Sequence, residues 1–238
     1  MRPVPLRALG AELLGTALLL WAIVGSGIVV AGDGPLLGQL VPHAIAVGIA
    51  LVALIALIAR LSGAHFNPVV TMAAVALGHL PRSHGPGYVA AQLVGAVLGT
   101  LLANLTAGLP AVTVSARARD GATLVVSEVV ATLVLVLLIF LMVRAGRSVG
   151  AIAAAVGAYI GAAIVLTPST SFANPAVTVA RTLSDTFTGI APASVTGFVV
   201  AQLVGGMLAV VAVRALTRRP SIAGGAGGED SADAVSGR

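Results

Sequence analysis

Six apolar stretches, each long enough to cross a lipid bilayer, take up most of this sequence. They cover residues 8–31, 41–59, 87–107, 122–143, 149–166 and 194–213. A transmembrane helix needs about 20 mostly apolar residues, and a chain with 58% hydrophobic and only 9% charged residues is poorly suited to water. Because little remains for a soluble domain, the sequence predicts an all-α membrane protein with six transmembrane helices.

The placement of the positive charges predicts how the chain lies in the membrane. If the six stretches cross in turn, ten of the 13 basic residues, all arginine, fall on the side of the N-terminus, and Arg117, Arg119 and Arg181 fall on the other. Cytoplasmic loops carry such an excess of arginine, so we expect both termini in the cytoplasm and the chain in the inner membrane. The charge of +5 then indicates a lipid partner and no nucleic acid. Residues 217–238, rich in Gly, Ser, Ala and Asp, are predicted to be a disordered cytoplasmic tail.

The chain contains an internal repeat, because three features occur twice in the same order. They are the sequence Ala-Gln-Leu-Val-Gly at 91–95 and 201–205, an Asn-Pro pair at 67–68 and 174–175, and a glutamate, Glu12 or Glu128, near the start of the first or fourth stretch. Each unit has three apolar stretches, which is an odd number. The second unit must therefore lie upside down in the membrane relative to the first.

The two Asn-Pro pairs predict re-entrant segments. Each pair precedes a short apolar run, at 69–77 or 176–183, which at about 1.5 Å per residue covers about half the hydrocarbon thickness. Proline in the first turn and asparagine before it are typical of a helix start, so both runs are predicted to be half-helices that begin near the midplane. Irregular backbone is tolerated there only where it lines a watery cavity or is buried in protein. A central pore is the expected result.

These motifs resemble the paired Asn-Pro-Ala boxes of the aquaporin and aquaglyceroporin family. The resemblance rests on residues 62–69, Ser-Gly-Ala-His-Phe-Asn-Pro-Val, and on Asn-Pro-Ala at 174–176. It implies a channel domain at 1–216, with repeats at about 8–107 and 122–213, that passes water and small neutral solutes. It also implies a homotetramer without catalytic residues, bound metal or other cofactor. The pore-binding residues that it implies are Asn67, Pro68, Val69, Asn174, Pro175 and Ala176.

Residues in this pattern can exclude ions. The N-terminus of a helix carries about half a positive charge, and two such termini at one constriction oppose cations. The amides of Asn67 and Asn174 can donate hydrogen bonds to a solute while their oxygens cap the half-helices. The resemblance further implies that backbone carbonyls before the motifs line the pore and interrupt a proton wire. These carbonyls belong to Gly63, Ala64 and His65 in one loop and to Ser169, Thr170, Ser171 and Phe172 in the other.

Glu12 and Glu128 are acidic residues inside long apolar stretches, so a functional role is the first expectation. In one interpretation they couple transport to protons. In the other, which the resemblance and their symmetric positions favour, each carboxylate accepts hydrogen bonds from a re-entrant loop and holds its carbonyls toward the pore. Gln92 and Gln202 are equally symmetric, and we expect them to do similar work or to pair between helices.

The sequence departs from water-selective relatives at the expected selectivity filter. Those relatives place an aromatic residue, a histidine, a small residue and an arginine near the outer mouth. The matching positions here are Val47, Ala162, Ser171 and Val177, so the arginine and the aromatic ring are missing. A wider, less polar constriction follows. Residues 174–177 resemble the bacterial aquaglyceroporin branch associated with arsenic resistance, which adds glycerol-sized polyols and uncharged metalloid acids such as arsenite to the expected solutes.

The sequence leaves two alternative functions and the location of one residue undecided. The alternatives are a narrow water-selective aquaporin and an ion-coupled secondary transporter that uses Glu12 and Glu128. A transporter usually needs a titratable group at the midplane, and the sequence offers none beyond these two. An enzyme would need an activated nucleophile or a metal cluster, and neither is visible.

Arg181, four residues beyond Val177, can line the outer vestibule or contact lipid headgroups or another subunit.

Overall fold

A computed structural model describes residues 4–217 of the chain, and all regular secondary structure in that range is helical. Six helices are long and apolar enough to cross a membrane, which confirms the predicted all-α class. They are α1 (Leu6–Val30), α2 (Leu36–Ser62), α4 (Gly85–Thr106), α5 (Ala122–Arg144), α6 (Val149–Leu166) and α8 (Pro192–Leu216). Three short elements complete the fold: α3 (Pro68–Ala76), α7 (Pro175–Ala180) and the 3-10 helix η1 (Arg181–Leu183). The predicted tail, beyond Thr217, lies outside the described residues.

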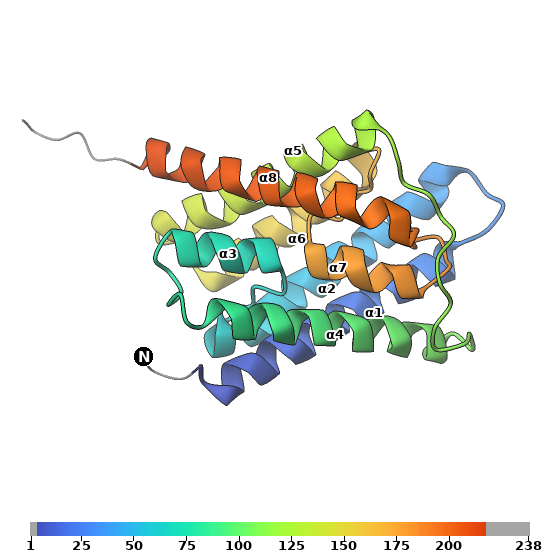
Figure 1. The fold of residues 1–238 in the computed structure, drawn as a ribbon, viewed down its shortest axis with the longest axis horizontal. Helices are drawn as coiled ribbons and strands as arrows, with labels where there is room; N and C mark the ends of the chain where they lie inside the picture. The colour runs from blue at the N-terminus through green and yellow to red at the C-terminus, as the bar shows by residue number, and fades with distance from the viewer. Residues whose placement is uncertain (1–3, 218–238) are drawn as a thin grey trace, which may run out of the picture.

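The helices pair as an inverted repeat requires. The pair α1 and α4 in the first repeat corresponds to α5 and α8 in the second, and both pairs pack extensively. The equivalent helices α2 and α6 pack on each other and join the two repeats. Figure 1 shows α3 and α7 in the middle of the bundle, α3 toward the end that carries the N-terminus and α7 toward the opposite end. Each half-helix also packs on the other repeat, α3 on α8 and α7 on α4.

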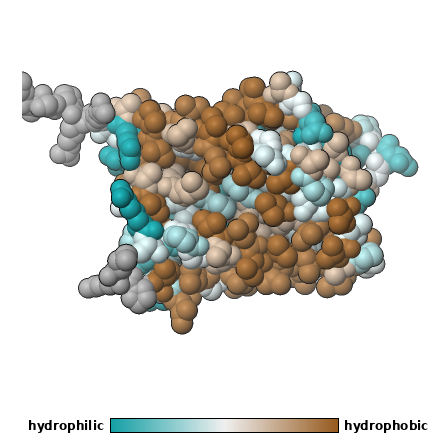
Figure 2. Space-filling model, viewed as in Figure 1, coloured by the Kyte–Doolittle hydropathy of each residue, from teal (hydrophilic) through white to brown (hydrophobic). Residues whose placement is uncertain are grey.

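The outside of the bundle suits a bilayer. Large apolar side chains are exposed along the long helices, among them Leu57, Val130 and Val211. Figure 2 shows a broad hydrophobic band around the middle of the visible face, with hydrophilic residues gathered toward the two ends. With no water to satisfy the backbone in the hydrocarbon, helices bond internally and can present such a surface to lipid. The chain is an integral membrane protein.

Glycines permit the closest helix contacts. A Cβ atom at Gly95 or Gly99 of α4 would collide with the backbone carbonyl of Leu13 or Ala17 in α1. In the same way, Gly48 of α2 and Gly157 of α6 each lie against the other's carbonyl oxygen. Small residues at such positions let helix backbones approach closely, which is how membrane helices gain packing energy in lipid.

Replacing Gly99 with alanine is expected to destabilise the fold by about 1–3 kcal/mol, because the added methyl group would push α1 away from α4. Gly25 of α1 has open space around it, so the same replacement there should be neutral or stabilise the helix by up to about 1 kcal/mol. The thermal unfolding midpoint of the purified protein in detergent measures both effects. A Gly99→Ala midpoint at or above that of the parent would contradict the close approach.

Candidate pore

The two Asn-Pro motifs meet and bond to each other at the centre of the fold. Asn67 and Asn174 are the N-caps of α3 and α7, and their side-chain oxygens accept hydrogen bonds from backbone N–H groups of the first turn. Their amide nitrogens reach across: Nδ2 of Asn67 donates to the carbonyl of Ala173 at 2.7 Å, and Nδ2 of Asn174 donates to the carbonyl of Phe66 at 2.8 Å. Each amide has two N–H groups, so one donor on each asparagine remains for a solute.

The chain before each motif follows a strained path. Ala64 and Phe66 in the first loop, and Thr170, Ser171 and Ala173 in the second, all have φ between 47° and 59°. Non-glycine residues adopt this left-handed region at a cost, and they persist there where the surroundings hold them. The carbonyls predicted to line the pore accept no hydrogen bond within the described part of the chain. They are those of Gly63, Ala64, His65, Ser169, Thr170, Ser171 and Phe172.

Glu12 lies behind the first loop and accepts hydrogen bonds from it on both oxygens. Its Oε1 receives Ser62 Oγ at 2.6 Å and the backbone N–H of His65 at 2.9 Å. Its Oε2 receives the N–H of Phe66 at 2.8 Å and Gln92 Nε2 at 2.7 Å. A carboxylate that is bonded on both oxygens is an acceptor for the loop, and the loop's own N–H groups therefore point away from the cavity.

Glu128 repeats this arrangement in the second half of the chain. Its oxygens accept the backbone N–H groups of Phe172 and Ala173, each at 2.8 Å, and Gln202 Nε2 at 2.7 Å. Gln202 also donates to Thr178 at 2.8 Å, as Gln92 does to Thr71 at 2.9 Å. The glutamines therefore link each carboxylate to a half-helix, and the buried Glu–Gln–Thr network is duplicated with the fold.

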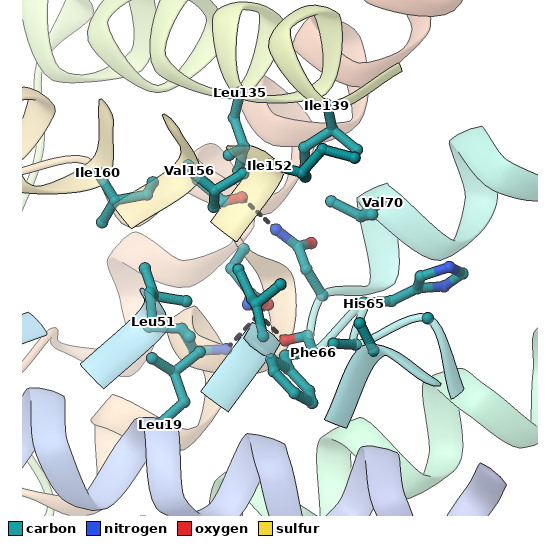
Figure 3. A pocket seen from close by; sticks show the side chains of 18 of the residues that line it. Leu19, Leu51, His65, Phe66, Val70, Leu135, Ile139, Ile152, Val156 and Ile160 are labelled. Atoms are coloured by element: carbon teal, nitrogen blue, oxygen red, sulfur yellow. Dashed lines mark hydrogen bonds between the residues drawn. The ribbon is translucent and has the colours of Figure 1, made fainter. Parts of the chain in front are cut away.

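A cavity of about 360 Å³ runs past both loops. One wall is apolar and comes from the long helices; Figure 3 shows Leu51, Leu135, Val156 and Ile160 facing this space from several helices. The other wall is polar and comes from the two loops, including Asn67 and Asn174. A polar solute in such a cavity can exchange some of its bound water for hydrogen bonds to the carbonyls and amides. It can do so only on the side that faces the polar wall.

A second cavity of about 350 Å³, here called the vestibule, is lined by the start of α2, the end of α6 and neighbouring loops. Figure 1 shows the start of α2 at the end of the bundle opposite the N-terminus. Its residues are Leu36, Leu40, His43, Arg117, Arg119, Val165, Leu166, Thr167, Pro168, Thr170, Arg181 and Phe187. Thr170 and Arg181 line both cavities, so they mark where the vestibule meets the pore. Arg181 is 4% exposed, and its guanidinium carbon lies 3.5 Å from the ring centroid of Phe172.

The structure brings most of the predicted pore residues to the main cavity. The lining includes Val47, Gly63, Ala64, His65, Asn67, Thr170, Ser171, Phe172, Asn174 and Val177. Pro68, Val69, Pro175 and Ala176 do not line it and are buried in the half-helices behind the asparagines. The ring of His65 lines the cavity and bonds through Nδ1 to Thr71 at 3.1 Å, which anchors its loop.

One expectation about the filter is wrong, and the structure decides the location of one residue that the sequence left open. Ala162 is exposed on the outside of α6, and the cavity is lined instead by Ile152, Val156, Ile160 and Ile164, four residues apart on one helix face. Arg181, on η1 one turn beyond the motif position, lines both cavities, so of its possible locations the structure selects the vestibule. The spacing of branched side chains among alanine and glycine in α6 is the signal that could have identified the lining face.

Comparison with known proteins agrees with this geometry. A sequence model described as major intrinsic protein matches residues 2–171. The chain belongs to the major intrinsic protein family. It is 44% identical over 217 residues to aquaglyceroporin AqpS of Rhizobium meliloti (strain 1021), covering 89% of this chain and 91% of that protein. Aquaporin NIP6-1 of Arabidopsis thaliana is 40% identical over 92 residues, which is 38% of this chain and 30% of that protein.

A solved structure shows the same major intrinsic protein fold. The X-ray structure of the aquaglyceroporin from Plasmodium falciparum superposes with a TM-score of 0.71 and covers 87% of this chain and 94% of that one, at 24% identity. Aquaglyceroporins of the family are channels and not enzymes, and the six long helices place this chain in a membrane. It is a passive channel for water and small neutral solutes.

Proposed function

We propose that this channel passes glycerol-sized polyols and uncharged metalloid acids such as arsenite as well as water. The observation that carries the proposal is Val177, which is 2% exposed and lines the cavity at the motif position where water-selective relatives carry arginine. Arsenite near neutral pH is As(OH)3, a neutral polyol of similar size to glycerol. Val47 and Ile160 add apolar surface to the same wall, which suits the carbon or metalloid side of such a solute.

Proposed roles for the loop residues follow from their bonds. Asn67 and Asn174 offer one amide donor each, and the carbonyls of Gly63, Ala64, His65, Thr170 and Phe172 offer acceptors. A solute hydroxyl can therefore donate to a carbonyl and accept from an amide as it passes the centre. Val47, Ser171, Val177 and Arg181 are proposed to form the selectivity filter, with Ile160 in place of Ala162.

The position of the two carboxylates favours a channel over a coupled transporter. Glu12 and Glu128 are fully buried, and neither lines the cavity. Both oxygens of each carboxylate accept hydrogen bonds from the loops and glutamines. A proton-coupling site must exchange protons with the solute pathway, whereas these groups lie behind the pore wall. We propose that they hold the loop carbonyls toward the pore.

The distribution of charge and the family of the chain support proposals for its orientation, membrane and oligomeric state. We propose that residues 1–216 form the channel domain, that both termini are cytoplasmic and that the protein resides in the inner membrane as a homotetramer. The arginine distribution supports the orientation. Under it, the vestibule opens to the outside.

Replacing Asn67 with aspartate is expected to raise cation leak by about an order of magnitude, because a negative charge would offset the positive field at the N-terminus of α3. Replacing Asn174 should act in the same direction. Sodium and proton leak in proteoliposomes measures the effect, with an Asn67→Ser variant as the uncharged control. If leak stays at the parent level while water flux shows an intact channel, the proposed electrostatic barrier is absent.

Stopped-flow swelling of proteoliposomes tests the proposed solutes. Water, glycerol, urea and arsenite are compared at equal osmotic gradients and matched protein density. We expect glycerol and arsenite to cross at rates well above those of empty liposomes. Water flux alone, with glycerol and arsenite at the empty-liposome rate, would mean a water-selective aquaporin and would overturn the proposal.

A further inference from the structure

Two buried arginines carry positive charge into the lining of the vestibule. Arg119 and Arg181 are 9% and 4% exposed, and both guanidinium groups stack on the ring of Phe172, with carbon to centroid distances of 4.9 Å and 3.5 Å. Arg117 lies close by, 5.4 Å from the ring centroid of Phe187. Burial, together with repulsion from Arg117, lowers the pKa of Arg119 to about 10, and Glu128 partly opposes this shift. Arg119 therefore keeps its charge at neutral pH.

In the described part of the chain these charges have no carboxylate partner. Within residues 4–217 no ion pair involves Arg117, Arg119 or Arg181, and neither cavity has an Asp or Glu in its lining. The acids of the neighbouring loops are engaged elsewhere: Asp185 accepts the backbone N–H of Ala116 at 3.0 Å, and Asp120 accepts Ser194 Oγ at 2.7 Å. Buried charges in proteins are normally paired. A mobile anion can supply the missing partner.

The arginines also keep free donors. Arg181 donates Nε to the carbonyl of Thr188, and Arg119 donates Nε to Gly189 and Nη2 to Phe187. Within residues 4–217, no hydrogen bond uses either terminal amino group of Arg181 or Nη1 of Arg119. The two bonds through Nε fix the side chains in place, and both residues line the vestibule. A guanidinium with free terminal N–H groups fits the forked geometry of a carboxylate or phosphate oxygen pair.

We propose that the vestibule is a binding site for a small oxyanion, held between Arg181 and Arg119, and that an anion bound there obstructs the passage of neutral solutes. The obstruction follows from position, because Arg181 stands where the vestibule meets the pore. Chloride lacks the paired oxygens and binds less well in such a fork. The site needs only the geometry described and does not depend on which neutral solutes the channel passes.

Inorganic phosphate at pH 7 is the probe, since it crosses bilayers poorly. Isothermal titration of the full-length protein in detergent should give saturable phosphate binding that sodium chloride at equal ionic strength does not reproduce. Arg181→Gln and Arg119→Gln should each weaken binding by about tenfold or more, because each removes a charge-assisted contact. Arg214→Gln is the matched control: Arg214 donates to the carbonyl of Ala76 near the end of α3, away from the vestibule, so binding should be unchanged.

Water flux in proteoliposomes gives the second readout, with phosphate on both sides of the membrane. Phosphate should lower flux in the parent and in Arg214→Gln and should lose this effect in Arg119→Gln. If Arg181→Gln does not fold, Arg119→Gln and Arg117→Gln decide the matter by the same titration. Absence of saturable binding to the parent, or unchanged affinity in folded Arg119→Gln, would overturn the site. Flux measured without phosphate stays a separate test of the proposed function.

Discussion

Replacing Val177 with arginine is expected to cut glycerol and arsenite flux by about an order of magnitude while most of the water flux is retained. Val177 lines the cavity and lies one turn before Arg181, so the new side chain would add a second guanidinium to the same stretch of the pore. The effect is steric first, since a long side chain replaces a short one. It is electrostatic second, because five further N–H donors suit water.

The comparison uses stopped-flow swelling at matched protein density. A Val177→Met variant adds length without charge, so it separates the effect of side-chain size on flux from the effect of charge. If the arginine variant passes glycerol and arsenite as well as the parent does, Val177 does not control the width of the pathway, and the basis of the proposed solute range is wrong.

Replacing Glu128 with alanine should lower solute flux by an order of magnitude or more and also destabilise the protein. The backbone N–H groups of Phe172 and Ala173 would lose their acceptor, as would Gln202. Each buried donor left without a partner costs about 1–3 kcal/mol. The loop residues held at positive φ, Thr170, Ser171 and Ala173, would relax, and their carbonyls would leave the pore wall. Glu12→Ala should do the same to the first loop.

Glutamine at either position is the informative control, because it keeps one oxygen acceptor and removes the charge. We expect Glu128→Gln to retain more flux than Glu128→Ala, with little dependence on pH. Flux of water and glycerol between pH 5 and 8, together with the unfolding midpoint in detergent, measures both effects. If glutamine and alanine lower the flux equally, and flux through the parent depends steeply on pH, the carboxylate does not act by holding the loop. Proton coupling would then be the better interpretation.

The sequence predicted the features that repeat. The Asn-Pro pairs locate both half-helices to within a residue at their starts, at Pro68 and Pro175, because the residues that begin a helix are local signals. The family resemblance and their symmetric positions placed Glu12 and Glu128 behind the loops, and the structure puts each carboxylate within hydrogen-bond distance of its own loop. Local chemistry, duplication and the family resemblance carry this information.

The filter shows where such prediction ends. A helix in lipid is apolar on every side, so hydrophobic periodicity does not reveal which face of α6 meets the pore. Ala162 was therefore assigned by spacing, and the structure turns it outward in favour of Ile160. The sequence did not decide whether Arg181 faces the vestibule, lipid headgroups or another subunit. The direction of its side chain depends on contacts with Phe172 and Thr188, which lie on other segments. Tertiary contacts decide the direction of Arg181, whereas in α6 the four-residue spacing of branched side chains, rather than hydrophobicity, marks the lining face.

The passive passage of glycerol is the central claim, and its flux against concentration tests it most directly. Initial glycerol uptake into proteoliposomes is measured over a wide range of outside concentrations, with and without a protonophore. The account predicts uptake proportional to the gradient, equal inside and outside concentrations at the end, and no effect of the protonophore. Accumulation of glycerol above the outside concentration, abolished by the protonophore, would contradict it.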